Sequence, residues 1–183
     1  SWVAAVMKQL DNPNADEIAR IEPLVDKTVV GHLQVADGEH AGGVKKSLFY
    51  YDPTVFHNLY QPAKDWQSWT SWKKDQADDL GRAYNYPHVA AGHWVLYRIA
   101  RNHRGMTRVH AWDWYLDHAY QTIVAMMRDA PHYAQFGLME GDVFVDILTD
   151  LKREGWTAKA AEVERLMKGR ADHWRTLQYP FGS

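Results

Sequence analysis

The clearest feature of the hydrophobic pattern is a run from Ala83 to Tyr97 that contains no Asp, Glu, Lys or Arg and is followed by the charged segment 98–104. A run of this kind is expected to be buried on most sides. Pro87 suits a first helical turn, where its missing N–H would have no partner, and Gly105 is a typical stop after a basic last turn. The pattern therefore predicts a buried helix over residues 87–103.

Three more helices are predicted after this one, because apolar residues recur at the three-and-four spacing of an amphipathic helix. The second follows a short loop, so it is expected to lie antiparallel to the first, and the third ends at Gly155 after a basic last turn. Thr157 is the expected N-cap of the fourth. Their apolar faces are Trp112, Leu116, Ala119, Ile123, Met126 and Met127; then Val143, Phe144, Ile147, Leu148 and Leu151; then Ala160, Val163, Met167, Trp174 and Leu177.

The N-terminal third has a mixed pattern. Residues 2–10 are expected to be the end of an apolar helix, and Asn14 is expected to cap a short helix over 15–22 that Pro23 ends. Two β-like runs, 28–35 and 44–51, flank a Gly-rich stretch and predict an irregular excursion or β-hairpin near residues 27–51. Residues 52–54 are expected to open a helical turn that reaches Leu59. The predicted fold class is mainly α: a single domain of helical hairpins.

Composition excludes several classes of function. The formal net charge is -2, so no basic field is available to attract nucleic acid, and no run reaches the roughly 20 apolar residues of a membrane span. The absence of Cys excludes disulfides, thiolate zinc sites and cysteine nucleophiles. Neither a phosphate loop, a dinucleotide fingerprint nor a nucleophile elbow is present, so no cofactor is expected.

Aromatic residues are the first candidate chemistry, since the chain has nine Trp and ten Tyr. Flat rings stack on the C–H faces of sugars. Core packing is the stronger interpretation for the triplet Trp66, Trp69 and Trp72, because Trp is usually well buried. Trp112 and Trp114 diverge by about half a turn on a helix and cannot both face the core. One of these two is therefore expected to line a cleft.

Carboxylates are the second candidate, because glycoside hydrolysis usually needs two of them about 5 to 9.5 Å apart. Glu140 is the preferred general acid, because it lies at a helix entrance between Met139 and Gly141. An acidic residue is also common there for the helix dipole alone. Asp113 could share a helix face with Asp117, although salt bridges to nearby arginines explain both equally well. The acidic residues considered are Asp37, Glu39, Asp52, Asp113, Asp117 and Glu140.

The ten histidines do not predict a metal site. Metal ligands on one helix would need a spacing such as i and i+4 with a carboxylate nearby, whereas His88 and His93 are five residues apart and point in different directions. A polar His88 that hydrogen-bonds a substrate hydroxyl is the better interpretation. No metal ligand is therefore predicted.

Four segments together resemble an uncharacterised bacterial family of the six-hairpin glycosidase superfamily: 37–43, 84–91, 112–116 and 179–183. The resemblance implies a toroid of inner and outer helices with a substrate cleft at one end, and a secreted or periplasmic enzyme acting on a poly- or oligosaccharide. Twelve helices of about 11 to 12 residues need more than 183 residues. We therefore expect a partial toroid, truncated at both ends and completed by the remainder of a parent chain.

Two functions of different classes follow. The first is glycoside hydrolysis by paired carboxylates, with Glu140, Asp113 and Glu39 as the candidate catalytic residues. The second is a non-catalytic helical module that binds glycans or a protein partner through the same aromatic rim. In both, loop-to-helix junctions at one end of the bundle are expected to form the cleft, and truncation is expected to leave apolar stripes exposed on residues 2–10 and on the last helix. The candidate substrate-binding residues are Tyr84, Asn85, His88, Trp112 and Trp114.

Overall fold

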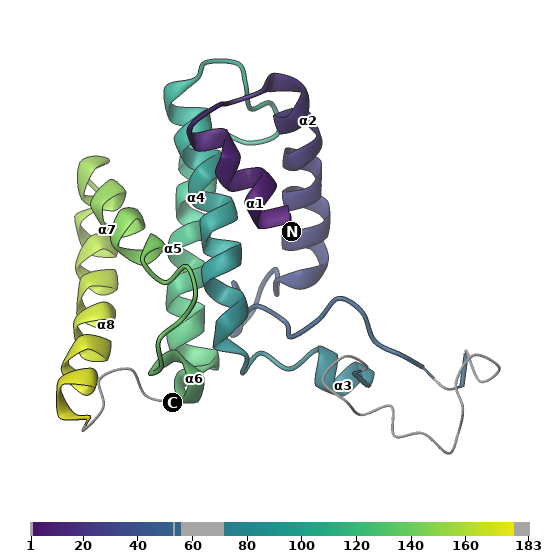
Figure 1. The fold of residues 1–183 in the computed structure, drawn as a ribbon, viewed down its shortest axis with the longest axis vertical. Coiled ribbons are helices and arrows are strands. Elements are labelled where there is room, and N and C mark those ends of the chain that lie inside the picture. Colours follow the sequence, from purple (N-terminus) through teal and green to yellow (C-terminus); the bar gives the residue numbers. More distant parts are fainter. Residues whose placement is uncertain (1, 53, 56–71, 178–183) are drawn as a thin grey trace.

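The computed structural model describes residues 2–52, 54–55 and 72–177, and this part of the chain is mainly helical (Figure 1). The predicted fold class is confirmed. No described helix is both long enough and apolar enough to cross a membrane. The elements in chain order are α1 (Trp2–Met7), η1 (Lys8–Leu10), α2 (Ala15–Pro23), η2 (Leu24–Leu33), α3 (Lys74–Ala77), η3 (Ala83–Asn85), α4 (Tyr86–Asn102), α5 (Trp112–Asp129), α6 (Pro131–Ala134), α7 (Val143–Arg153) and α8 (Thr157–Thr176).

The antiparallel pair α4 and α5 forms the centre of the molecule (Figure 1). At one end the rings of Tyr97 and Trp112 are 6.1 Å apart, and near the middle those of His93 and His118 are 5.3 Å apart. Helix α4 is buried on nearly all sides from residue 86 to residue 97, as its uncharged sequence predicts. Its predicted range, 87–103, differs from the observed one by a single residue at each end, which is the usual uncertainty of a helix boundary.

Helices α7 and α8 form a second hairpin that packs beside α4 and α5 (Figure 1). Gly155 has a φ of 75° and ends α7, as predicted. The predicted N-cap of α8 is wrong, because Thr157 is the first helical residue and Trp156 occupies the cap position without a side-chain hydrogen bond. On the apolar face of α8, Ala160 and Val163 are buried. The C-terminal part of this face is only half-buried: Met167, Trp174 and Leu177.

The N-terminal segment departs from the prediction after Pro23. Asn14 caps α2 as expected, with Oδ1 accepting from the N–H groups of Asp16 and Glu17 at 3.0 Å. Pro23 does not end the helix, however. The chain passes into the wider turns of a π-helix over 24–33, and the Gln34 N–H donates to the Val29 carbonyl at 2.7 Å. Proline lacks the N–H of an i to i−4 hydrogen bond, and the next N–H, that of Leu24, donates to the Ile21 carbonyl, so the helix continues past Pro23 without that bond.

The β-like run over 28–35 is therefore wrong as a strand prediction, since most of it is helical. Val25 and Val29 share a helix face and are buried in the core, and this packing overrides their weak intrinsic β preference. The following loop is irregular, as predicted. A single antiparallel bridge between Gln34 and Val44 closes it within the described residues.

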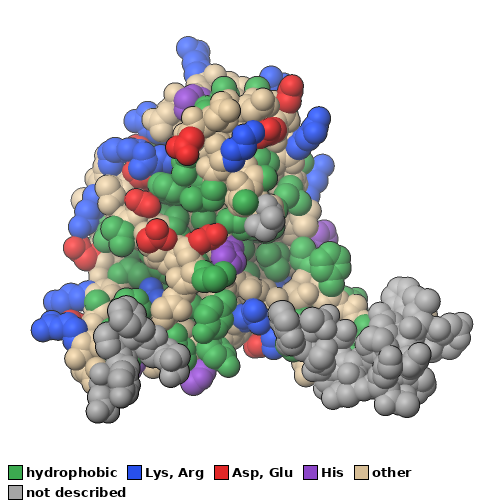
Figure 2. All heavy atoms as spheres, viewed as in Figure 1, with side chains coloured by type: hydrophobic (Ala, Val, Ile, Leu, Met, Phe, Trp, Pro, Cys, Tyr) green, Lys and Arg blue, Asp and Glu red, His purple; other side chains and the backbone are tan. Residues whose placement is uncertain are grey.

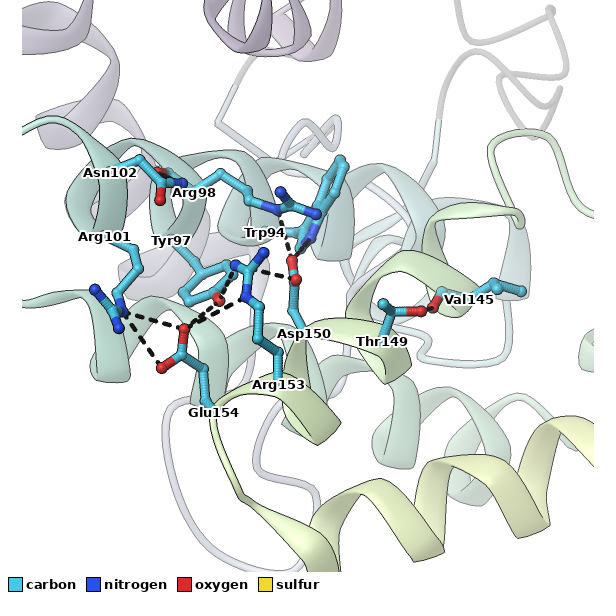
Figure 3. Close-up of polar contacts among 10 residues, drawn as sticks. All are labelled: Trp94, Tyr97, Arg98, Arg101, Asn102, Val145, Thr149, Asp150, Arg153 and Glu154. Atoms are coloured by element: carbon cyan, nitrogen blue, oxygen red, sulfur yellow. Dashed lines mark hydrogen bonds and ion pairs between the residues drawn. The ribbon is translucent and has the colours of Figure 1, made fainter.

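Buried charge ties α4 to α7 (Figure 3). Asp150 is fully buried and accepts from Trp94 Nε1 at 2.8 Å and from Arg98 Nε at 2.6 Å. Arg153 Nη2 lies 3.1 Å from the other carboxylate oxygen of Asp150 and donates to the Tyr97 hydroxyl at 2.7 Å. A desolvated carboxylate needs several such donors, so this network fixes how the two hairpins dock.

The surface in the orientation of Figure 1 is divided by polarity. Hydrophobic side chains form a band through the middle of this face, and Lys and Arg side chains gather mainly around its upper and left edges (Figure 2). Several predicted features lie outside the described residues: the turn reaching Leu59, Trp66 and Trp69, and the segment 179–183. Trp72 is described, and Lys46 Nζ lies 4.0 Å from its ring centroid.

Candidate functional site

The first turn of α4 carries one half of a close polar pair. His88 Nδ1 lies 2.6 Å from Glu140 Oε2, although the two residues are 52 positions apart in the sequence. The side chains remain 29% and 41% exposed, so a ligand can reach both. Glu140 belongs to the loop between α6 and α7, and the fold of this loop over the start of α4 creates the pair. We call His88 and Glu140 the dyad.

The backbone of Glu140 is strained. Its φ is 60°, and it is the one residue other than glycine with a positive φ in the described part of the chain. A left-handed conformation costs a residue with a Cβ roughly 1 to 2 kcal/mol. Strained residues of this kind are concentrated at functional sites, where the surrounding structure maintains them. Here the conformation holds the Glu140 carboxylate against His88.

Exposed tyrosine rings lie at the same end of the bundle. Tyr84 precedes α4 in η3, and its ring centroid is 5.9 Å from that of Tyr133 in α6. The two residues are 38% and 44% exposed. The rings of His132 and Phe136 contact Tyr133 at 4.7 and 6.3 Å. Tyr84, Tyr133 and the dyad are called the tyrosine–dyad surface below.

Asn85 lies beside this surface but has an internal structural role. Its side-chain amide donates to the carbonyls of Lys45 and Lys46 at 3.0 and 2.9 Å, and its Oδ1 accepts from Arg82 Nε at 3.2 Å. These contacts occupy both ends of the amide and attach the segment 45–46 to the start of α4. Asn85 therefore positions this end of the bundle, although it was predicted to bind substrate.

Glu39 is exposed in the loop between Gln34 and Val44, at the C-terminal end of α5. Its neighbours attach the loop there: His40 Nδ1 lies 2.8 Å from Asp129 Oδ1, and Arg128 donates to the Ala41 carbonyl at 3.1 Å. Because α4 and α5 are antiparallel, this loop and the dyad belong to the same end of the hairpin.

Asp113 lies elsewhere. It is exposed in the first turn of α5, level with Tyr97, and its carboxylate accepts from the adjacent Trp114 N–H at 3.0 Å. Tyr97 is nine residues beyond His88, which is about 13 Å along the helix axis at 1.5 Å per residue. The structure therefore does not bring Asp113 together with the dyad at the separation that paired-carboxylate hydrolysis uses.

The two tryptophans of α5 pack against other rings. Trp112 lies 6.1 Å from both Tyr97 and Trp156. Trp114 is sandwiched between His110 and His118, at 3.6 Å from each centroid. Both tryptophans are half-buried against the core, Trp112 beside Tyr97 and Trp114 beside His93, 6.0 Å away. The prediction that Trp112 or Trp114 lines one cleft with Tyr84, His88 and Glu140 is not met by Trp112, which lies at the other end of the hairpin.

The histidine stack is a feature that sequence reasoning missed. Trp114 and His118 are one turn apart on α5, whereas His110 lies in the loop before the helix and reaches Trp114 only through the fold of that loop. His93 faces the stack from α4 and is fully buried, with Nε2 2.8 Å from Gln34 Oε1. Burial, followed by the nearby His118 and His110, holds the pKa of His93 well below its usual value. Burial also lowers the pKa of His118.

The described residues contain no group of three or more His, Asp or Glu side chains placed to hold a metal ion. Comparison with known proteins gives one family: the model described as a family of unknown function, DUF5695, matches residues 1–183. No curated protein and no solved structure matches the chain.

Proposed function

We propose that this chain, which belongs to the family of unknown function DUF5695, binds carbohydrate at the tyrosine–dyad surface. The observation that carries the proposal is the His88–Glu140 contact of 2.6 Å, at a residue with a strained backbone and at the same end of the bundle as two exposed tyrosine rings. Strain that is maintained at an exposed polar pair favours a functional role over a purely structural one.

The chemistry of the surface suits a sugar. Tyr84 and Tyr133 offer ring faces to the C–H face of a pyranose, and both are rigid side chains that lose little entropy on binding. The dyad offers an imidazole and a carboxylate, which together donate to and accept from neighbouring hydroxyls. The resemblance to the six-hairpin glycosidases supports the same substrate class, a poly- or oligosaccharide.

Hydrolysis of a glycosidic bond is the second candidate, and the exposed carboxylate of Glu140 favours it. An exposed carboxylate paired with His88 can exchange a proton with a leaving oxygen or a water, as a general acid or base does. In this form of the proposal Glu140 is the acid/base residue. Glu39, at the same end of the hairpin, is the candidate second carboxylate.

Binding is tested by titrating the protein with a panel of oligosaccharides in a calorimeter. Tyr133→Ala is expected to weaken binding of the best ligand by on the order of 1 to 3 kcal/mol, taking base stacking on aromatic rings as the analogue. Phe49→Ala removes an aromatic side chain that is 84% exposed at a different place and is expected to change nothing. Equal effects of the two substitutions, or no binding to any member of the panel, would contradict the proposal.

Hydrolysis is tested by measuring reducing-end release from the same oligosaccharides. Glu140→Gln is expected to lower turnover about 10² to 10⁴-fold, the usual contribution of a general acid or base, while binding changes little. Asp113→Asn is the matched control, and near-normal turnover is expected for it. If the protein binds but releases no reducing ends, Glu140 has a binding role only.

A further inference from the structure

A groove separates α7 from α8 near the loop that carries Glu140. Its volume is about 600 Å³, which lies in the range of small-molecule sites. Residues of the loop, Gly137 to Asp142, contribute to one rim, but the floor and walls are formed by the two helices. The lining is mainly apolar: Leu138, Phe144, Val145, Leu148, Met167 and Trp174.

Arg170 is the one charged residue of the lining that is buried. It is only 6% exposed, and no carboxylate of the described residues lies within ion-pair distance of its guanidinium. Three exposed charged residues also line the groove: Asp142, Glu164, which is paired with Lys152 at 3.1 Å, and Lys168. A buried cation without a counter-ion is costly, which distinguishes this groove from an ordinary apolar depression.

Some N–H donors of the Arg170 guanidinium are not used within the described residues. Nε donates to the Ala134 carbonyl at 2.6 Å, Nη2 donates to the Phe136 carbonyl at 3.0 Å, and Nη1 lies 3.6 Å from Met167 Sδ. Arginine has five N–H donors, so one N–H on each terminal nitrogen has no acceptor among the described residues. Two N–H groups on neighbouring nitrogens are the donors that a carboxylate accepts from in a bidentate pair, and we call these two N–H groups the free fork.

The rings around the guanidinium hold it in place. Its central carbon lies 5.8 Å from the Phe144 centroid and 5.0 Å from the Trp174 centroid. Together with the two carbonyl contacts, these rings fix the orientation of the free fork. The same rings belong to the groove lining, so an apolar body attached to a bound carboxylate would lie against them.

We propose that the groove between α7 and α8 binds a small amphipathic carboxylate, with the carboxylate on Arg170 and the apolar body along Leu148, Met167 and Trp174. This site is separate from the tyrosine–dyad surface, and the proposal does not depend on carbohydrate binding. A fatty acid or an aryl-alkanoic acid has the required chemistry, because each joins one carboxylate to an apolar chain or ring.

Calorimetric titration with decanoate tests the proposal, with decanol as the neutral probe of the same length. The dissociation constant of decanoate is expected to be at least about tenfold lower than that of decanol, because only the carboxylate can pair with the guanidinium fork. Equal constants for the two probes, or binding of neither, would overturn the proposal. If decanoate does not bind because a second copy of the chain occupies the groove, the proposal is overturned in the same way.

Variants locate the site. Ala171→Trp fills the groove from an exposed position and is expected to weaken decanoate binding by about tenfold or more, whereas Ala161→Trp, at an exposed position of α8 outside the groove, leaves it unchanged. Arg170→Lys keeps the charge but removes the fork, so it is expected to affect decanoate and not decanol. Loss of decanoate binding in Ala161→Trp to the same extent as in Ala171→Trp would place the ligand elsewhere.

Discussion

At the scale of single residues, Glu140 shows what the sequence can and cannot predict. Its position at a helix entrance indicated a functional carboxylate, and the structure places it in an exposed loop against His88. The contact itself was not predictable, because it joins residues 52 positions apart and depends on how the loop before α7 folds over α4. The positive φ of Glu140 was likewise not predictable, since glycine is the residue type from which a positive φ is normally predicted.

The strain at Glu140 gives the first prediction. Glu140→Gly and Glu140→Ala both remove the contact with His88, but only glycine relieves the left-handed backbone. We expect Glu140→Gly to be more stable than Glu140→Ala by about 1 kcal/mol in the free energy of unfolding, measured in urea. Both variants are expected to lose carbohydrate binding. If the alanine variant is as stable as the glycine variant, the backbone at this position is not strained.

The buried histidines give a prediction about pH. The folded-state pKa values of His93 and His118 lie below the ordinary 6.5, so below that pH the unfolded chain binds protons that the folded chain does not. Stability should therefore fall as the pH is lowered from 7.5 to 5.5, by up to about 1.4 kcal/mol for each histidine. His118→Gln should reduce this difference in urea unfolding. An unchanged pH dependence in that variant would exclude His118 as a cause.

At the scale of elements, the prediction succeeded where the pattern was strongly periodic and failed where a local signal competed with packing. The bounds of α4 were predicted to within one residue, and the apolar faces predicted for the next two helices lie within α5 and α7, because an uncharged or amphipathic run allows few alternatives. Pro23 and the β-branched run after it suggested a break and a strand. The segment is helical instead, because Val25 and Val29 are buried in the core. Local sequence propensities do not predict this tertiary packing.

The docking of α7 on α4 depends on Asp150. Asp150→Ala would leave Trp94 Nε1 and the Arg98 guanidinium without their buried acceptor, so we expect a loss of about 3 to 5 kcal/mol in the free energy of unfolding. The control is Asp146→Ala, at an exposed position of the same helix, which should change stability by no more than about 0.5 kcal/mol. Similar losses for the two variants would show that Asp150 contributes no more than a surface charge.

The docking of α1 on α4 depends on a glycine. A Cβ at Gly92 would come within 2.7 Å of the Trp2 ring, so Gly92→Ala should destabilise the protein even though alanine favours a helix. In a Trp2→Ala background the same substitution should instead stabilise it, by up to about 1 kcal/mol. This reversal of sign would be measured by urea unfolding of the four proteins in the cycle. The same sign in both backgrounds would mean that Trp2 does not pack on Gly92.

At the scale of the whole molecule, the two ends of the α4–α5 hairpin differ in chemistry. One end holds the dyad, the tyrosines and the loop with Glu39, whereas the other holds Asp113 and the packed Trp112. The sequence predicted the types of residue but assigned both groups to one cleft. It could not separate them, because residue types and spacing give no distance between junctions on different helices. The surface that we propose for carbohydrate therefore comprises the dyad and the tyrosines and leaves out the rim of tryptophans.

The position of bound carbohydrate tests this account most directly. Backbone amide chemical shifts of the ¹⁵N-labelled protein would be followed by NMR while it is titrated with the oligosaccharide that binds best. We expect the shifts to change around residues 84–88, 132–136 and 139–141 and to remain constant around residues 110–114. Changes that concentrate around Trp112 and Asp113 and leave His88 and Glu140 unaffected would contradict the assignment of the tyrosine–dyad surface.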